Sequence, residues 1–285
     1  MVSGLWAASA TPVAPDGSVD HPALADHAQR LIQRGCDGLV LFGTSGEGPS
    51  FSIAQRLAAT EAVLRAGVPV MKLALATGCP AVVDTIAMTK ASLALGITQA
   101  LLVPPFYFAG APDQGIEDAF AEVIDSVADN RLSACLYHIP QVSGVGVPAS
   151  VLERLRTRYG SIVAGVKDSS GDFESFLAFR RAAPDATVLV GAEVLIARAL
   201  AQGGGGTICG MANLVPSLVR RMFDGSEAEA DMQEACDHVD GIPIMKAALA
   251  EMTGEPIWNR VRPPLRAADE AAARRAAVVL SRLEG

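Results

Sequence analysis

One lysine of the chain stands where its chemistry should differ from that of a surface lysine. Lys167 closes the apolar run Ile162–Lys167, and Asp168 then leads the chain through a turn into a helix. Apolar surroundings disfavour the charged ammonium and lower the pKa of a lysine toward the neutral amine. A neutral amine can attack a ketone and form a Schiff base. Position alone leaves an alternative open, in which Lys167 pairs with a carboxylate at the rim of the sheet.

The other three lysines have less suitable positions. Lys72 comes early in the predicted strand Val70–Ala76, so its side chain should lie away from the carboxyl end of that strand. Lys90 and Lys246 fall in helical stretches, where a solvated charge is the expected role. Lys167 is therefore the candidate nucleophile.

A second candidate feature follows the run Gly38–Phe42. The sequence Gly43-Thr44-Ser45-Gly46-Glu47 places two hydroxyls between glycines, ahead of a helix that should start near Ser52. Backbone N–H groups and hydroxyls in such a turn can bind an anion such as a carboxylate. An ordinary tight turn with a helix cap is the alternative.

Two of the three tyrosines also fall at predicted strand ends. Tyr137 is the penultimate residue of the predicted strand Ala134–His138, and Tyr107 follows the predicted strand Ala100–Val103. A tyrosine beside a Schiff-base lysine can move protons if a neighbour orients its hydroxyl. His138 should point the opposite way, into the layer between strands and helices, because successive side chains alternate along a strand. Tyr159 has a position typical of packing.

These candidate residues need a scaffold that brings strand ends together. Apolar runs alternate with amphipathic stretches such as the one through Ile116, Phe120 and Ile124. Strands buried on both faces are typical of parallel sheets, and eight such units predict a (β/α)8 TIM barrel with its active site at the carboxyl ends. The predicted strands are Leu5–Ala10, Gly38–Phe42, Val70–Ala76, Ala100–Val103, Ala134–His138, Ile162–Lys167, Thr187–Val190 and Thr207–Cys209.

The domain organisation follows from where this alternation stops. Glycines at 35, 67, 96 and 160 stand where helices should end before the next strand. Residues 1–224 hold the eight units, and residues 225–285 read as helical, with a break at Pro263-Pro264. This remainder is too short for an independent α/β domain. We expect one barrel domain with a C-terminal helical extension packed on it.

A phosphate site is an alternative use of such a barrel. Gly203-Gly204-Gly205-Gly206 lies near the eighth strand, where many barrels bind phosphate. The glycines precede that strand instead of following it, and neither G-x-x-x-x-G-K-[ST] nor G-x-G-x-x-G occurs. Phosphate binding is therefore the weaker hypothesis.

Composition narrows the classes of function. The 285 residues carry 23 Lys+Arg against 31 Asp+Glu, a net charge of −8 that argues against nucleic acid or an anionic membrane as the main partner. No apolar stretch reaches the roughly 18 residues that a membrane helix needs. The start around Trp6 does not resemble a signal peptide. Five scattered cysteines lack metal or disulfide spacing, so we expect a cytoplasmic protein with no bound metal.

Taken together, these residues resemble the N-acetylneuraminate lyase / dihydrodipicolinate synthase superfamily of class I, pyruvate-handling aldolases. The resemblance covers nearly the whole chain. It depends on three motifs in the family's order and spacing: Gly43-Thr44-Ser45-Gly46-Glu47, Tyr137-His138-Ile139-Pro140 and Gly165-Val166-Lys167-Asp168.

The resemblance implies a role for each matching residue. Lys167 would form the imine with pyruvate or another 2-oxo acid, so no metal or diffusible cofactor would be needed. Tyr137 would be the acid/base, linked through Thr44 to a Tyr107 that reaches in from a neighbouring subunit of a homo-oligomer, a dimer of dimers. The implied substrate-binding residues are Gly43, Thr44, Ser45, Ser169, Gly191, Glu193 and Ile208.

Departures from the family's motifs bear on the substrate. Val142 stands where members that use aspartate semialdehyde have an arginine, and Glu193 is a single acid where sialic acid lyases have an acidic pair. The stretches 48–52 and 167–169 look most like 2-keto-3-deoxy-sugar-acid aldolases. We therefore expect a lyase that releases pyruvate and a small hydroxyaldehyde, bound through Ser143, Ser169 and Glu193. Dihydrodipicolinate synthase and a catalytically silent 2-oxo-acid-binding barrel are the alternatives.

Overall fold

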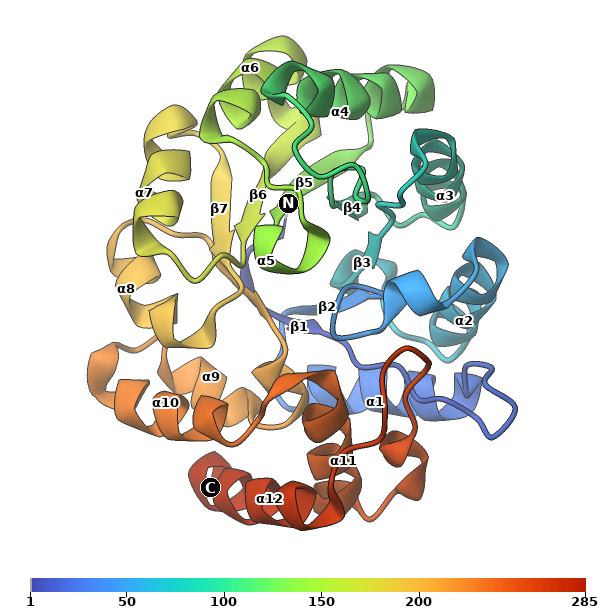
Figure 1. The fold of residues 1–285 in the computed structure, drawn as a ribbon, viewed down its shortest axis with the longest axis vertical. Coiled ribbons are helices and arrows are strands. Elements are labelled where there is room, and N and C mark those ends of the chain that lie inside the picture. Colours follow the sequence, from blue (N-terminus) through green and yellow to red (C-terminus); the bar gives the residue numbers. More distant parts are fainter. Residues whose placement is uncertain (1) are drawn as a thin grey trace.

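Eight parallel strands form the closed barrel that the sequence predicts. The computed structural model describes residues 2–285, and each strand pairs with its sequence neighbours, with β8 returning to β1 (Figure 1). The strands are Gly4–Ala8 (β1), Gly38–Leu41 (β2), Leu73–Ala76 (β3), Gln99–Leu102 (β4), Ser133–His138 (β5), Val163–Asp168 (β6), Thr187–Val190 (β7) and Gly206–Cys209 (β8). The TIM-barrel prediction is confirmed.

Helices surround the barrel and begin and end where local chemistry favours it. Ser52 caps α2 in a reciprocal capping box with Gln55. Gly35 and Gly67 follow helices at φ of 94° and 90°, a conformation that glycine adopts without strain. The helices are His21–Gln33 (α1), Ile53–Arg65 (α2), Val82–Ala94 (α3), Asp113–Val127 (α4), Pro140–Ser143 (α5), Ala149–Tyr159 (α6), Phe173–Ala182 (α7), Ile196–Ala201 (α8), Pro216–Arg221 (α9), Glu229–Asp237 (α10), Gly241–Thr253 (α11) and Glu270–Glu284 (α12).

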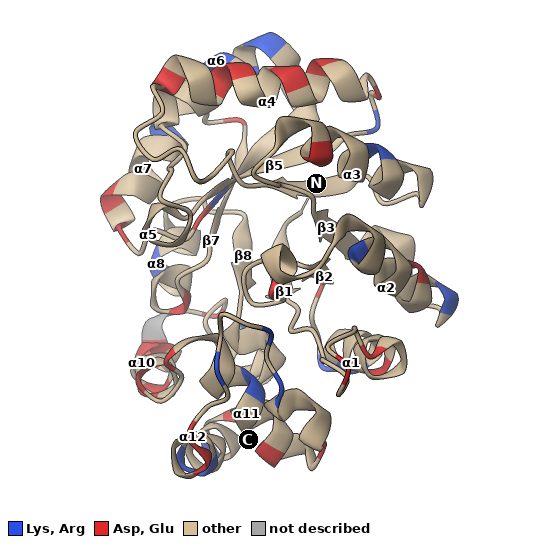
Figure 2. Cartoon of the chain, turned by 45° about the vertical axis from the view of Figure 1, so that its right-hand side comes forward, with Lys and Arg blue, Asp and Glu red and all other residues tan. Residues whose placement is uncertain are grey.

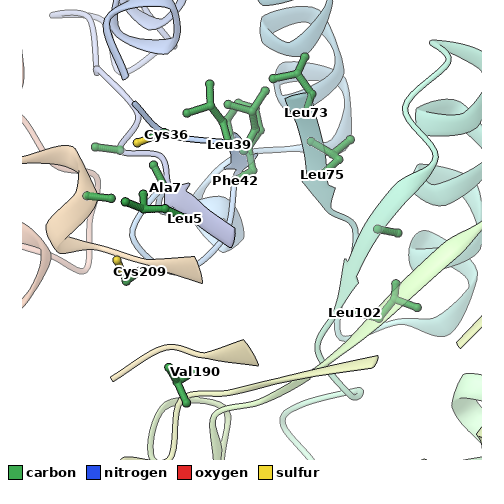
Figure 3. Close-up of a cluster of buried hydrophobic side chains, with 14 of the residues drawn as sticks. Leu5, Ala7, Cys36, Leu39, Phe42, Leu73, Leu75, Leu102, Val190 and Cys209 are labelled. Atoms are coloured by element: carbon green, nitrogen blue, oxygen red, sulfur yellow. The ribbon is translucent and has the colours of Figure 1, made fainter. Parts of the chain in front are cut away.

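Alternation along the strands produces two buried layers. One set of side chains points outward and packs under the helices, and part of this outer layer is drawn in Figure 3, including Leu5, Ala7, Leu39, Leu73, Leu75 and Leu102. The other set fills the barrel interior: Trp6, Ala8, Val40, Ala74, Leu101, Cys135, Tyr137, Leu189 and Ile208. Charged residues lie mostly on the surrounding helices (Figure 2). The inward set ends at the carboxyl edge, where it supplies the candidate site.

The third strand is shorter than the sequence predicts. Val70–Lys72 forms a 3-10 turn, and the strand begins at Leu73. The turn starts after Pro69, whose carbonyl accepts a hydrogen bond from the Lys72 amide, and Met71 is 76% exposed there. The sequence predicted a strand over Val70–Lys72 because the apolar side chains in this turn have the same pattern as those of a buried strand. Lys72 does lie at the amino end, away from the candidate site.

The C-terminal segment packs beside α1 at the edge of the barrel (Figure 1). Trp258 is fully buried with its ring centroid 4.7 Å from that of His27. Arg34 binds Glu284 at 2.6 Å and so joins α1 to α12. Among residues 2–285, no helix has the length and apolar character needed to cross a bilayer.

Candidate active site

A cavity of about 350 Å³ opens at the carboxyl ends of the strands. Lys167 projects into it from β6 and is only 5% exposed. The lining residues include most of the side chains that the sequence singles out: Thr44, Ser45, Tyr137, Lys167, Ser169, Gly191, Glu193 and Ile208. These residues come from β2, β5, β6, β7, β8 and the loops that follow them, so only barrel closure brings them together.

A chain of hydroxyl groups leads away from the lysine. The Nζ of Lys167 donates to the Tyr137 hydroxyl at 3.2 Å and lies 4.3 Å from the centre of that ring. The Tyr137 oxygen is in turn 3.2 Å from Oγ1 of Thr44. Across residues 2–285, no carboxylate lies within ion-pair distance of Lys167. The alternative of a lysine paired with a rim carboxylate is therefore contradicted.

The environment of Tyr137 favours a proton-transfer role. Burial by itself raises the pKa of the phenol. The Lys167 charge and hydrogen bonding by Thr44 and Ser169 outweigh burial, so the pKa lies below its usual value. A phenol with a lowered pKa is closer to the range in which it can accept and return a proton during turnover.

The loop after β2 holds Thr44 and Ser45 in a tight turn. The Glu47 amide donates to the Thr44 carbonyl at 3.0 Å. A Cβ on Gly48 would lie 1.8 Å from the Phe42 carbonyl oxygen, so only glycine fits there. The turn directs the Thr44 and Ser45 side chains into the cavity.

The opposite side of the cavity is built by β6, β7 and the loops that follow. A Cβ on Gly191 would lie 1.9 Å from Oγ of Ser169 and 3.0 Å from Cε of Lys167, so this glycine keeps space open beside the lysine. Burial raises the pKa of Glu193, whose Oε1 accepts backbone N–H groups of Gly210 and Met211 at 3.0 and 3.1 Å. One carboxylate oxygen of Glu193 is therefore already engaged in hydrogen bonds to the protein backbone.

Residues far along the chain complete the outer wall of the cavity. Cys236, Val239, Ile242 and Met245 come from α10, α11 and the connection between them. All four side chains are apolar or nearly so, and burial raises the pKa of the Cys236 thiol to about 12, which keeps it neutral. The sequence analysis missed these residues because helical periodicity does not distinguish a wall residue from an ordinary core residue.

Three predicted residues lie outside this cavity. Gly43 and Ser143 line a neighbouring cavity of about 270 Å³, on the side of Tyr137 that also includes Phe106. The Ser143 hydroxyl lies 2.9 and 2.6 Å from the backbone carbonyl oxygens of Ile139 and Val145, and Ser143 does not line the cavity that holds Lys167. Its contact with substrate stays a prediction. Tyr107 is 83% exposed and lines neither cavity of its own chain.

Strand direction decides where His138 and the polyglycine run lie. The His138 ring packs on Phe179 at 5.3 Å, between strand and helix, as predicted. The polyglycine run enters β8 from its amino end, where Gly205 donates to the Val188 carbonyl, so it lies away from the candidate site. In the described part of the chain, no three His, Cys, Asp or Glu side chains gather as metal ligands would.

The prediction for Lys246 is wrong. Its side chain is fully buried in α11 and forms an ion pair of 2.5 Å with Glu47, which is equally buried. The helical pattern around Lys246 does not show that this face turns toward the barrel mouth, and the carboxylate partner is about 200 positions away.

Comparison with known proteins decides the family. The model of the dihydrodipicolinate synthetase family matches residues 1–272. The chain belongs to this family. It is 36% identical to an "Uncharacterized DapA-like lyase" of Chloroflexus aurantiacus, over 86% of this chain and 85% of that one. It is 32% identical to a 4-hydroxy-tetrahydrodipicolinate synthase of Thermomicrobium roseum, over 90% of this chain and 83% of that one.

Solved structures agree with this membership. A dihydrodipicolinate synthase from Agrobacterium tumefaciens superposes with a TM-score of 0.93 at 31% identity, covering 99% of each chain. A 2-keto-3-deoxygluconate aldolase variant of Sulfolobus solfataricus, at 22% identity and a TM-score of 0.84, covers 98% of this chain and 96% of its own; it shares the fold. The protein is thus a lyase of the dihydrodipicolinate synthetase family.

Proposed function

We propose that this lyase forms a Schiff base with its substrate and reversibly cleaves a short 2-keto-3-deoxy sugar acid to pyruvate and a hydroxyaldehyde. One observation carries the proposal. Lys167 is buried without a carboxylate partner, and its Nζ lies 3.2 Å from a tyrosine hydroxyl that is itself 3.2 Å from Thr44. This arrangement suits a nucleophilic amine with a proton carrier beside it.

The reaction follows from these positions. The Lys167 amine attacks the C2 ketone, and loss of water leaves an iminium that withdraws electrons from C3. Tyr137 accepts the proton of the C4 hydroxyl as the C3–C4 bond breaks, which releases the aldehyde and leaves an enamine. Tyr137 then returns this proton to C3 of the enamine, and hydrolysis of the resulting imine by water releases pyruvate and restores the amine. The overall cleavage is redox-neutral, so the proposed reaction uses no redox partner and no diffusible cofactor.

The substrate carboxylate would be bound by the loop after β2. The Thr44 and Ser45 side chains line the cavity together with Lys167. Hydroxyls and backbone N–H groups at this turn can bind both carboxylate oxygens while the ketone carbon faces the amine. This binding would orient C2 for attack.

The cavity favours an uncharged aldehyde. Lys167 is the only cation among the described residues that line it, and the outer wall from α10 and α11 is apolar. Val142, at the position where an arginine would bind a second carboxylate, is 62% exposed and lines the neighbouring cavity. Burying an unpaired carboxylate is costly. The Ser169 hydroxyl, which also hydrogen-bonds to Tyr137, and the second carboxylate oxygen of Glu193 are the groups proposed to bind a substrate hydroxyl.

Dihydrodipicolinate synthase activity is the second candidate, since several relatives carry the name 4-hydroxy-tetrahydrodipicolinate synthase. It requires the same imine with pyruvate, and aspartate semialdehyde as the acceptor. The proposal differs from it only in the aldehyde half of the substrate.

A second copy of the chain would supply Tyr107. The cavity beside Tyr137 reaches Thr44 from the side away from Lys167, and Phe106 forms part of its lining. Tyr107 and Phe108 are 83% and 74% exposed on the same loop, a large apolar surface for one chain to leave uncovered. We propose a homo-oligomer, a dimer of dimers, in which Tyr107 approaches Thr44 of a neighbour.

Borohydride reduction in the presence of pyruvate tests the proposal. One reduced pyruvate unit should be added to the wild-type protein, and peptide mass mapping should place it on Lys167. The adduct should be lost in Lys167→Ala and kept in Lys90→Met, which removes an exposed lysine. An adduct on another lysine would overturn the proposal. Trapping without release of pyruvate from any of a panel of 2-keto-3-deoxy acids would overturn the proposed cleavage. It would then favour the synthase if aspartate semialdehyde is condensed with pyruvate, and the silent binding barrel if it is not.

A further inference from the structure

A buried ion pair joins the candidate active-site loop to the C-terminal helices. The Nζ of Lys246 lies 2.5 Å from Oε1 of Glu47, and both side chains are 0% exposed. The second oxygen of Glu47 accepts the backbone N–H of Arg262 at 2.7 Å. One carboxylate thus connects the loop after β2, helix α11 and the extended segment that follows Asn259.

Both ends of the pair adjoin the cavity. Glu47 follows Thr44 and Ser45 in the same turn, which its own amide closes through the Thr44 carbonyl. Lys246 follows Met245, whose side chain forms part of the apolar wall. The ion pair therefore sets the position of the turn proposed to bind the carboxylate relative to the helix that faces the rest of the substrate.

The backbone of this turn needs an external restraint. Phe42 and Glu47, on either side of Thr44 and Ser45, have φ of 58° and 53°, in the left-handed region that is strained for residues other than glycine. Such conformations persist where the surrounding structure holds them. The Thr11 hydroxyl donates to the Gly46 carbonyl at 2.7 Å, and Glu47 is held through its carboxylate.

Stability alone does not account for a pair of this kind. Removing two charges from water costs much of what their attraction returns, so apolar residues of equal volume would stabilise the fold about as well. What the charged pair provides beyond an apolar contact is a defined direction and distance between Glu47 and Lys246. The Lys246 ammonium is also paired with a carboxylate, so it is a poor nucleophile and does not compete with Lys167 for the substrate ketone.

We infer that Glu47 and Lys246 are positioning residues for pyruvate, through which the C-terminal extension sets the affinity of the candidate active-site loop. The inference rests on the proposed function, because it assumes that Thr44 and Ser45 bind the pyruvate carboxylate. Without the pair, the strained turn relaxes and the carboxylate contacts weaken. The chemistry at Lys167 is then little changed once pyruvate is bound.

The double variant Glu47→Gln/Lys246→Met tests this, because it removes both charges and nearly preserves volume. The KM for pyruvate in condensation should rise at least about tenfold, with kcat within about threefold of wild type and with Lys167 still trapped at saturating pyruvate. The matched control is Arg34→Gln/Glu284→Gln, which breaks another ion pair of the C-terminal extension, neither member of which lines the cavity. It should leave KM unchanged.

The outcomes separate the inference from the proposed function. A wild-type KM in the Glu47/Lys246 double variant, or a loss of kcat without a change in KM, overturns the inference while wild-type trapping at Lys167 still supports the proposed function. Absence of trapping in the wild type overturns the proposed function first. An equal rise in KM in the Arg34/Glu284 control would show a general effect of loosening the extension and would also overturn the inference.

Hydrogen exchange on the wild-type protein provides a test that does not depend on folding of a variant. The Arg262 amide donates to Glu47, so pyruvate should slow its exchange by about tenfold although Arg262 does not line the cavity. The Ala272 amide, which donates to Asp269 at 2.8 Å at the start of α12, is the matched control and should not respond. Unchanged exchange at Arg262 under saturating pyruvate overturns the inference.

Discussion

Replacing Tyr137 by phenylalanine removes one oxygen atom at the centre of the hydroxyl chain. That oxygen accepts a hydrogen bond from Nζ of Lys167 at 3.2 Å, and it lies 3.2 Å from Oγ1 of Thr44. The ring itself is 5% exposed and packs inside the barrel, so phenylalanine should keep its position and the fold. The variant therefore tests the hydroxyl with little disturbance of the packing.

Two effects of very different size are expected from this loss. A ground-state hydrogen bond contributes about 0.5–1.5 kcal/mol, which would weaken binding by about tenfold at most. A positioned proton carrier contributes about 10²–10⁴ in rate, or about 2.7–5.4 kcal/mol in the transition state. We expect Tyr137→Phe to lower kcat for pyruvate release by about 10²–10⁴ while borohydride still traps the imine at Lys167.

The pH dependence provides a second readout. Tyr137 must be deprotonated to accept the C4 hydroxyl proton, so kcat should rise with pH through a pKa below the usual tyrosine value, because the Lys167 charge and neighbouring hydroxyls outweigh burial. This limb of the profile should be absent in Tyr137→Phe. The matched control is Tyr159→Phe, which removes a hydroxyl bonded to Asp125 at 2.9 Å and should retain wild-type kinetics. A Tyr137→Phe turnover within about threefold of wild type would refute the reasoning.

Three further predictions concern the substrate, the assembly and stability. In steady-state assays, kcat/KM for condensation of pyruvate with glyceraldehyde or glycolaldehyde should exceed that with aspartate semialdehyde by at least about tenfold. This ratio corresponds to about 1.4 kcal/mol in the transition state. A preference for aspartate semialdehyde would favour the synthase. Tyr107→Phe should lower turnover, and wild-type enzyme should sediment as an oligomer; a fully active monomer would contradict the role of Tyr107. Burial lowers the pKa of His27 from 6.5 to about 4, so His27 stabilises the fold above pH 6.5 and up to about 3 kcal/mol is lost as pH falls toward 4. Urea unfolding at pH 7 and 5 should show the loss, reduced in His27→Gln; equal losses in both proteins would point to other groups.

Local sequence determined the barrel and the inner part of the candidate site. Apolar runs of four to six residues separated by amphipathic helices leave a parallel sheet as the arrangement that buries both faces of every strand. Alternation along β5 and β6 then directs Tyr137 and Lys167 inward and His138 outward. The turn after β2 is equally local, since its glycines and hydroxyls act within a few residues of one another.

Tertiary structure decided which groups surround Lys167 and Tyr137 in the cavity. Whether Lys167 has a carboxylate partner, and whether Ser143 reaches the cavity, depends on how separate loops converge at the mouth, which no periodicity records. The boundary of β3 was missed for a related reason: apolar residues in the turn Val70–Lys72 have the same pattern as strand residues, and only hydrogen bonding distinguishes them.

The C-terminal extension shows the difference most clearly. Its helices are readable from their periodicity, but a helical pattern specifies which residues share a face and leaves open what that face packs against. Closing the fold brings Ile242 and Met245 to the cavity wall and pairs Lys246 with Glu47, across 199 positions of the chain. A charge that looks solvated in the sequence is buried in the structure because its partner is supplied only when the barrel closes.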